Sequence, residues 1–167
     1  MRAGGVCAPA GGNIASPERI NYTANRGAPV EARVAGDQAV VAEAVRCTIP
    51  GDELVALVLA GGYGRGEGGY RVCGEKYLPY NDYDYFVVLN CGRSARRRIS
   101  RQLGILAHEL EDRVGVEVDF ALLSASTLHR LPFTLMYAEL QHGHRITWGD
   151  QDVLRRMRPM PIDRIPL

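Results

Sequence analysis

A short apolar segment that runs directly into a cluster of glycines constrains the fold of this chain most strongly. Residues 53–60 read ELVALVLA, and residues 61–69 read GGYGRGEGG. A nearly continuous apolar run of this length, bounded by turn residues, is typical of a buried strand. Glycines directly after a strand allow unusual backbone angles and let an anion approach the backbone N–H groups closely. The pair of segments therefore predicts a buried strand that ends in an anion-binding turn.

The glycine turn matches neither of two well-known phosphate-binding patterns. No Gly-Lys-Ser/Thr follows it, which excludes a Walker A loop, and G-x-G-x-x-G fits residues 62–69 only with a misfit. Arg65 within the turn offers a planar charged donor for a phosphate. A flexible surface loop is the alternative interpretation of the same residues.

Residues 82–89, DYDYFVVL, form a second strand-like segment that opens with two aspartates. Side chains two positions apart in a strand point to the same side, so Asp82 and Asp84 share one face. Tyr83, Tyr85 and Val87 take the opposite face, where they can pack against helices. The sequence thus predicts a strand with one acidic end and one apolar face.

A third strand, residues 115–123 (GVEVDFALL), alternates apolar and acidic residues. Glu117 and Asp119 point away from its apolar face, so pairing with strand 82–89 would bring three or four carboxylates together. Such a cluster repels itself and raises the pKa of at least one member, and a bound Mg²⁺, which prefers oxygen ligands, removes this repulsion. Aspartates that are simply solvated at a strand end are the alternative for a lone Asp-x-Asp.

The remaining periodicity predicts helices around one sheet. We expect a helix that begins at Asp37 as its N-cap, a second over residues 95–113, and a third over residues 131–142 with Pro132 in its first turn and Gly143 at its C-cap. Residues 144–149 predict a short strand, and residues 70–80 predict an irregular segment. The fold class is therefore α/β (α+β), with a mixed β-sheet of about four to five strands backed by helices.

Composition excludes several classes of protein. The 167 residues carry 20 Lys+Arg and 19 Asp+Glu, so the net charge of +1 gives no strong nucleic-acid signal. No apolar run approaches the roughly 18 residues of a membrane span, and no signal-peptide stretch opens the chain. The four cysteines show no C-x-x-C spacing, which disfavours a zinc site or a disulfide framework and indicates a cytoplasmic protein with reduced thiols.

Three segments together resemble the DNA polymerase β-like nucleotidyltransferase superfamily. They are LAGGYGRGE at residues 59–67, NDYDYF at 81–86 and VEVDF at 116–120. The family pattern is a Gly-Gly or Gly-Ser turn, an Asp-x-Asp strand and a third carboxylate on a nearby strand. The string GGYGRGE is most similar to the N-terminal transferase domain of the PII uridylyltransferases, and the resemblance spans about residues 37–150.

The resemblance implies a nucleotidyltransferase fold and a role for each matching residue. The turn formed by Gly61, Gly62, Tyr63 and Arg65 would bind the phosphates of a nucleoside triphosphate. Asp82, Asp84 and Asp119 would bind two Mg²⁺ ions, or Mn²⁺, and Asp119 would help to deprotonate the attacking hydroxyl. The implied reaction joins a nucleoside monophosphate to a hydroxyl-bearing protein or small-molecule acceptor and releases pyrophosphate.

The chain departs from the family pattern in length. Residues 68–76 resemble an insertion at the mouth of the site that could alter the choice of acceptor. Residues 1–36 predict a flexible arm, residues 37–150 the transferase domain, and residues 151–167 a tail that resembles the start of a missing helical domain. Asn81 stands where the family usually has serine.

These departures leave other functions open. One is a catalytically impaired module that binds a nucleotide or a partner. This includes an antitoxin-like minimal nucleotidyltransferase with a helical partner protein, which rests on family analogy alone. A Rossmann oxidoreductase is a more distant alternative, because the clean glycine fingerprint is missing.

Overall fold

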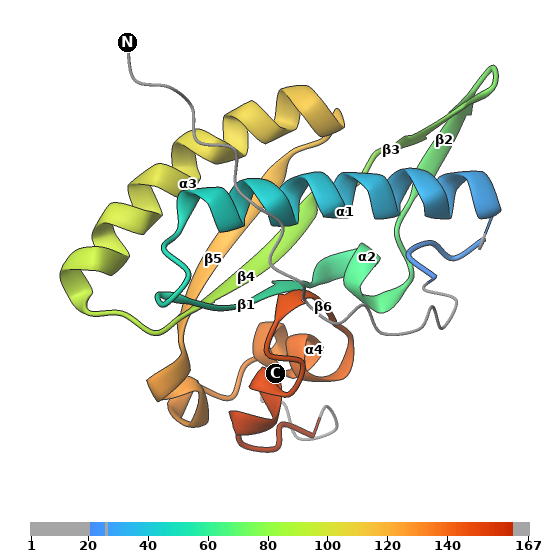
Figure 1. Ribbon diagram of the computed structural model, residues 1–167. Helices are drawn as coiled ribbons and strands as arrows, with labels where there is room; N and C mark the ends of the chain where they lie inside the picture. Colours follow the sequence, from blue (N-terminus) through green and yellow to red (C-terminus); the bar gives the residue numbers. More distant parts are fainter. Residues whose placement is uncertain (1–20, 26, 162–167) are drawn as a thin grey trace, which may run out of the picture.

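A computed structural model gives the structure of the protein and describes residues 21–25 and 27–161. Figure 1 shows a main sheet with helices against both of its faces and a smaller two-stranded unit beside it. The elements in chain order, with η for 3₁₀ helices, are α1 (Ala28–Thr48), β1 (Leu54–Leu59), α2 (Gly61–Arg65), β2 (Tyr70–Cys73), β3 (Lys76–Pro79), β4 (Tyr83–Leu89), α3 (Arg93–Val114), β5 (Val118–Ser124), η1 (Ala125–Arg130), α4 (Leu135–His142), β6 (Arg145–Gly149) and η2 (Val153–Arg156).

The main sheet is mixed and has the strand order β5-β4-β1-β6. β1 lies between β4 and β6 and runs antiparallel to both, whereas β4 and β5 are parallel. β4 and β5 are joined through α3, as parallel neighbours need a crossover connection. The α/β class, the mixed sheet and the helical cover expected from the sequence are confirmed.

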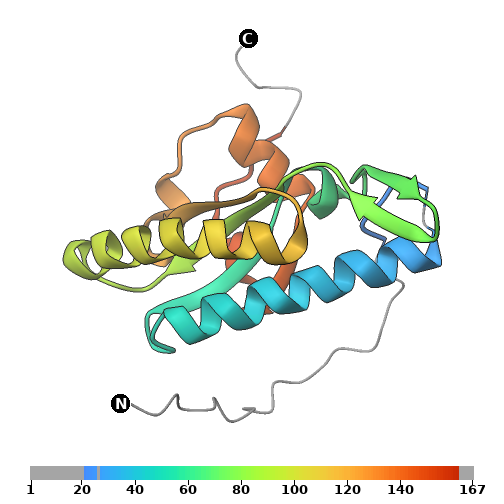
Figure 2. The ribbon, with the colours of Figure 1, turned by 90° about the horizontal axis from the view of Figure 1, so that it is seen from above.

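The two faces of the sheet bury separate hydrophobic cores. Tyr83, Tyr85 and Val87 of β4 face the core that α1 and α3 cover, as the alternation predicts. Phe86 and Val88 face the other core, which η1, α4 and η2 cover. Figure 2 shows the long helices α1 and α3 on one side of the strands and α4 on the other. The aspartate side chains at the start of β4 therefore point to the face that the shorter helices cover.

The first helix begins earlier than expected, so the predicted start at Asp37 is wrong. α1 begins at Ala28 after Gly27, with Pro29 in its first turn, where the missing N–H of proline costs nothing. Asp37 lies inside the helix and is buried. Residues 28–36 of the predicted arm are thus helical, and Thr23 forms a bridge with Gly68. Residues 1–20 and 26, also assigned to this arm, lie outside the described residues.

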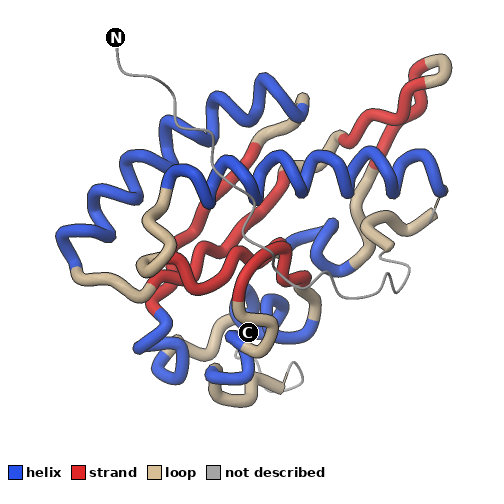
Figure 3. Tube along the Cα trace, viewed as in Figure 1, coloured by secondary structure: helices blue, strands red, loops and turns tan. Residues whose placement is uncertain are grey.

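Residues 70–80 form a β-hairpin, so the irregular segment expected there is wrong. β2 and β3 pair in antiparallel register from Tyr70 opposite Pro79 to Cys73 opposite Lys76. Figure 3 shows this two-stranded unit projecting away from the main sheet, near the N-terminal end of α1. The predicted insertion at residues 68–76 therefore forms most of a separate hairpin.

Two features of the C-terminal third differ from the sequence-based expectation: the start of α4 and the path of the chain after residue 150. α4 begins at Leu135, with Thr134 as its N-cap, so Pro132 lies before the helix, whereas Gly143 ends it as expected. Residues after 150 do not leave the domain directly, because Val153, Leu154, Met157 and Met160 are buried in the core beside α4. Residues 162–167 of the predicted tail lie outside the described residues. Among the helices of the described chain, none has the length and hydropathy to cross a membrane.

Candidate active site

Three aspartates lie close together where the parallel strands β4 and β5 begin. Asp82 directly precedes β4, Asp84 lies in β4, and the parallel register places Asp84 opposite Asp119 of β5. One carboxylate oxygen from each residue lies within 4.8 Å of the others. Glu117, the fourth carboxylate considered, is not part of this group. The convergence of the three predicted aspartates is confirmed.

Gly61 brings the glycine turn directly against these carboxylates. The Ala60 N–H donates to the backbone carbonyl of Asp84 at 2.8 Å, which fixes the end of β1 beside β4. Gly61 has a φ of 59°, and a Cβ at this position would lie only 2.1 Å from Oδ2 of Asp84. Only a residue without a side chain fits there. The glycine of the turn is thus required by the position of a carboxylate.

The residues around Asp84 change the pKa of its carboxyl group. Burial, and then the negative charges of Asp82 and Asp119, raise the pKa of Asp84 above its ordinary value, while Arg65 lowers it in part. Asp82 and Asp119 are exposed, whereas Asp84 is half-buried. Within the described chain, no donor hydrogen-bonds to the Asp84 side chain. Three oxygen donors with excess negative charge form a donor set that suits a hard divalent cation such as Mg²⁺.

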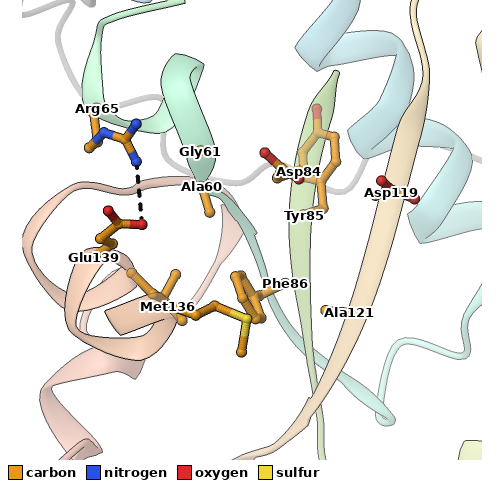
Figure 4. A pocket seen from close by; sticks show the side chains of 11 residues that line it. Ala60, Gly61, Arg65, Asp84, Tyr85, Phe86, Asp119, Ala121, Met136 and Glu139 are labelled. Carbon is orange, nitrogen blue, oxygen red and sulfur yellow. Dashed lines mark ion pairs between the residues drawn. The ribbon is translucent and has the colours of Figure 1, made fainter. Parts of the chain in front are cut away.

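Arg65 lies at the C-terminal end of α2 and forms two ion pairs. Its Nε contacts Glu67 at 2.9 Å, and its Nη1 lies 3.8 Å from Glu139 of α4. Figure 4 shows this second pair across the cavity from Asp84 and Asp119. Arg65 is therefore held near the aspartates by Glu67, which lies in the same glycine-rich segment, and by Glu139, which the sequence analysis did not connect with the site.

Tyr63, unlike Gly61 and Arg65 of the same turn, points its side chain into the protein interior. Its side chain is 1% exposed, and its hydroxyl donates to the Gly69 carbonyl at 2.5 Å. Burial raises its pKa to about 12. The Tyr63 ring therefore faces the core, so only the backbone of Tyr63 is left to take part in the predicted nucleotide-binding turn. Gly62 also lies outside the cavity lining, and its N–H is one of the first helical amides, which lack a partner inside the helix.

A cavity of about 230 Å³ begins at the carboxylates and extends towards α4. Its polar end is formed by Gly61, Arg65, Asp84, Asp119 and Glu139, and its apolar end is lined by Ala60, Tyr85, Phe86, Ala121, Met136 and Leu140. Phe86 and Ala121 follow Asp84 and Asp119 by two positions, so strand alternation could have placed them here. Met136 and Glu139 come from α4, and no local pattern linked that helix to the carboxylates.

The fold of the chain is similar to that of known nucleotidyltransferases. No protein-family model and no curated protein matches the sequence. Among solved structures, the spectinomycin adenyltransferase AAD(9) from Enterococcus faecialis, solved with ATP and spectinomycin, is similar to this chain with a TM-score of 0.52 and 10% identity. The match covers 77% of this chain and 61% of that chain.

Chains from two toxin–antitoxin complexes match less closely. One, from the complex of tri-AMPylated Shewanella oneidensis HEPN toxin with MNT antitoxin, has a TM-score of 0.40 and 19% identity over 70% of this chain and 72% of that chain. The other, from a mutant MntA–HpeT complex, has a TM-score of 0.44 and 18% identity over 71% and 77%. The similarity to AAD(9) shows that the chain has the nucleotidyltransferase fold, as the sequence indicated. A specific link to the PII uridylyltransferases remains a prediction.

Proposed function

We propose that the protein is a metal-dependent nucleotidyltransferase, which moves a nucleoside monophosphate from a nucleoside triphosphate to a hydroxyl-bearing acceptor and releases pyrophosphate. The observation that carries this proposal is the meeting of Asp82, Asp84 and Asp119 within 4.8 Å, beside the bend at Gly61. Fold alone does not define a reaction. The acidic cluster supplies the chemistry, because transfer of a charged phosphoryl group depends on positioning and on neutralising charge.

The residues present fit a pair of divalent cations. Asp82, Asp84 and Asp119 would hold the ions through their carboxylate oxygens, which reduces the repulsion that raises the pKa of Asp84. When bound, Mg²⁺ or Mn²⁺ stabilises charge on the attacking and leaving oxygens of an in-line displacement. Asp119, exposed at the edge of the cluster, is the carboxylate that we assign to accept the proton of the attacking hydroxyl.

The glycine turn and Arg65 would bind the phosphates. The backbone N–H groups of Gly61 and Gly62 open α2, where helical amides have no partner within the helix. Arg65, with its planar guanidinium, would bring a positive charge to the same side of the carboxylates. Tyr63 would position this turn through its buried ring rather than touch the nucleotide.

Donor and acceptor are proposed by chemical class. AAD(9), whose fold this chain shares, was solved with ATP and spectinomycin, which supports ATP among the donors and a small-molecule hydroxyl among the acceptors. A protein hydroxyl belongs to the same chemical class of nucleophile. The proposal also includes the helical partner protein and the cytoplasmic location that we expected from the sequence.

The test measures transfer directly. Purified protein is incubated with each of the four α-labelled nucleoside triphosphates, Mg²⁺ and a cell lysate as the source of acceptor, and both pyrophosphate and label transfer are measured. Asp84→Asn and Asp82→Asn should each reduce transfer by about 10³-fold or more, because a metal clamp supplies several kcal/mol of transition-state stabilisation. Asp112→Asn, the same change at an exposed position of α3, is the matched control and should retain activity.

The outcome separates the enzyme from the binding module. Metal-dependent pyrophosphate release that both aspartate variants lose supports the nucleotidyltransferase. Equal release from the wild type and both aspartate variants would contradict the assignment of the site. Tight nucleotide binding without any release would instead support a catalytically impaired module with the same fold.

A further inference from the structure

The cavity beside the carboxylates has an apolar end that the phosphate and metal chemistry does not use. Phe86 and Leu140 form its floor and are almost fully buried, with 6% and 1% exposed. Met136 of α4 also lines it and remains 50% exposed. Ala121 of β5 completes this apolar wall and is exposed as well. Figure 4 shows Met136 reaching across to Phe86.

The size and position of this wall restrict its ligand. A volume of about 230 Å³ lies below the roughly 300–1,000 Å³ of sites that hold a whole drug-sized ligand, so the cavity accepts one group of a larger molecule. A larger molecule held here would reach the polar end of the same cavity, where Gly61 and Arg65 lie. A group that is flat and apolar on its faces, and joined to phosphates, fits both ends at once.

A second cavity leaves a separate place for the acceptor. It has a volume of about 470 Å³, lies against Asp82 rather than Asp84 and Asp119, and is more polar, with Arg71, Asn81 and Glu117 among its lining residues. The two cavities share no lining residue, and each includes a different part of the aspartate cluster. In-line displacement brings the acceptor to the side of the phosphorus opposite the leaving group, and an acceptor site separate from the donor cavity suits this reaction.

We propose that the apolar wall formed by Phe86, Ala121, Met136 and Leu140 binds the base of the donor nucleotide. This inference rests on the proposed function. A base would pack its face against the exposed Ala121 and the polarisable thioether of Met136, which adapts to irregular surfaces, with the largely buried Phe86 ring beneath it. Because the wall contacts faces rather than hydrogen-bonding edges, it favours the larger purine ring over a pyrimidine by buried area.

The experiment compares two ligands that share a triphosphate and differ in the nucleoside. Calorimetry measures the binding of Mg²⁺–α,β-methylene-ATP and of Mg²⁺–tripolyphosphate to the full chain and to two variants, Met136→Ala and Ala121→Phe. Loss of the Met136 side chain should weaken the ATP analogue by about tenfold, given the apolar surface of two or three methylene-sized groups. The phenyl ring introduced at position 121 should fill the cavity and weaken the analogue by at least about tenfold on the same scale. Tripolyphosphate should bind all three proteins equally.

Leu135 offers a matched control, because it is the neighbour of Met136 on α4 and is 53% exposed but does not line the cavity. Leu135→Ala should leave the binding of both ligands unchanged. An unchanged affinity of the ATP analogue in Met136→Ala and Ala121→Phe would overturn the inference, and so would an equal loss for both ligands. If the wild-type chain binds tripolyphosphate and the analogue with equal affinity, the base has no subsite, yet the proposed function stands. If it binds neither ligand, both proposals fall.

Discussion

Two carboxylates on opposite sides of the main sheet, one buried and one half-buried, show how this protein separates stability from function. Asp37 of α1 lies on the face of the long helices, and Asp84 lies on the face of the cavity. Burial is the first cause of a raised pKa at both. The two residues differ in what surrounds them after burial.

Asp37 is surrounded by donors. Arg33 donates from Nε to both of its oxygens at 3.0 Å, and the Tyr83 hydroxyl donates to Oδ2 at 2.9 Å. Arg33 also donates to the Val114 carbonyl at 2.7 Å, so this cluster joins α1 to β4 and to the end of α3. Asp84, in contrast, is surrounded by Asp82 and Asp119. The donors around Asp37 offset part of the cost of burial and join three elements, whereas the like charges around Asp84 add to that cost and suit a cation.

The largest expected effect on stability is at Asp37. Asp37→Ala leaves the buried Tyr83 hydroxyl without its acceptor and removes the partner of Arg33, which should cost about 2 kcal/mol of the free energy of unfolding. Urea denaturation followed by circular dichroism measures this loss. Asp112→Ala, at an exposed site on α3, should change stability by less than about 0.5 kcal/mol. Equal stabilities of the two variants would show that the Asp37 cluster is not structural.

A smaller effect is expected from Gly61→Ala, which disturbs the other carboxylate. The left-handed φ at this position costs a residue with a side chain about 1–2 kcal/mol, and the new Cβ would collide with Asp84. Nucleotidyl transfer should fall much more than stability, because Asp84 must move. Gly36→Ala on α1, where a Cβ meets nothing within 4 Å, should instead stabilise the protein by up to about 1 kcal/mol. Full activity in Gly61→Ala would contradict the close contact.

The smallest expected effect on stability is an increase, and it is expected for Asp84→Asn. Asp84→Asn removes one of three like charges, so it should stabilise the metal-free protein at neutral pH by up to about 1 kcal/mol, the scale of partly screened charge pairs. Added Mg²⁺ should reverse the order, because an ion that binds only the folded wild type stabilises it. Thermal unfolding in EDTA and in Mg²⁺ measures both effects. A less stable Asp84→Asn in EDTA would contradict the repulsion inferred at this site.

The stability difference between Asp84→Asn and the wild type should depend on pH. Because the folded pKa of Asp84 is raised above its ordinary value of 3.8, the unfolded chain releases this proton first as pH rises. The contribution of Asp84 to the stability of the wild type therefore falls as pH increases through the interval between its unfolded and folded pKa values. The advantage of Asp84→Asn should be absent well below pH 3.8 and should reach its full size once the pH exceeds the raised folded pKa of Asp84. An advantage that does not change with pH would contradict its electrostatic origin.

Local patterns predicted those parts of the site that lie on one segment. Alternation along β4 placed Asp82 and Asp84 on one face and Tyr83 and Tyr85 on the other, because the side-chain period of a strand is two. The preference of aspartate for the N-cap position, in contrast, assigned Asp37 the wrong role, because Asp37 lies inside α1. The acidic residue four positions after Arg33 was the available signal, since such pairs face each other on a helix.

The sequence by itself determined which residues have the required chemistry and which of their neighbours share a face, because both follow from side-chain type and backbone period. Only the tertiary structure decided that β5 pairs in parallel with β4, so that Asp119 joins the cluster, and that α4 brings Met136 and Glu139 to the same cavity. These contacts join segments far apart in the chain. They depend on how the strands and helices bury their apolar surfaces together, and no local pattern records that arrangement.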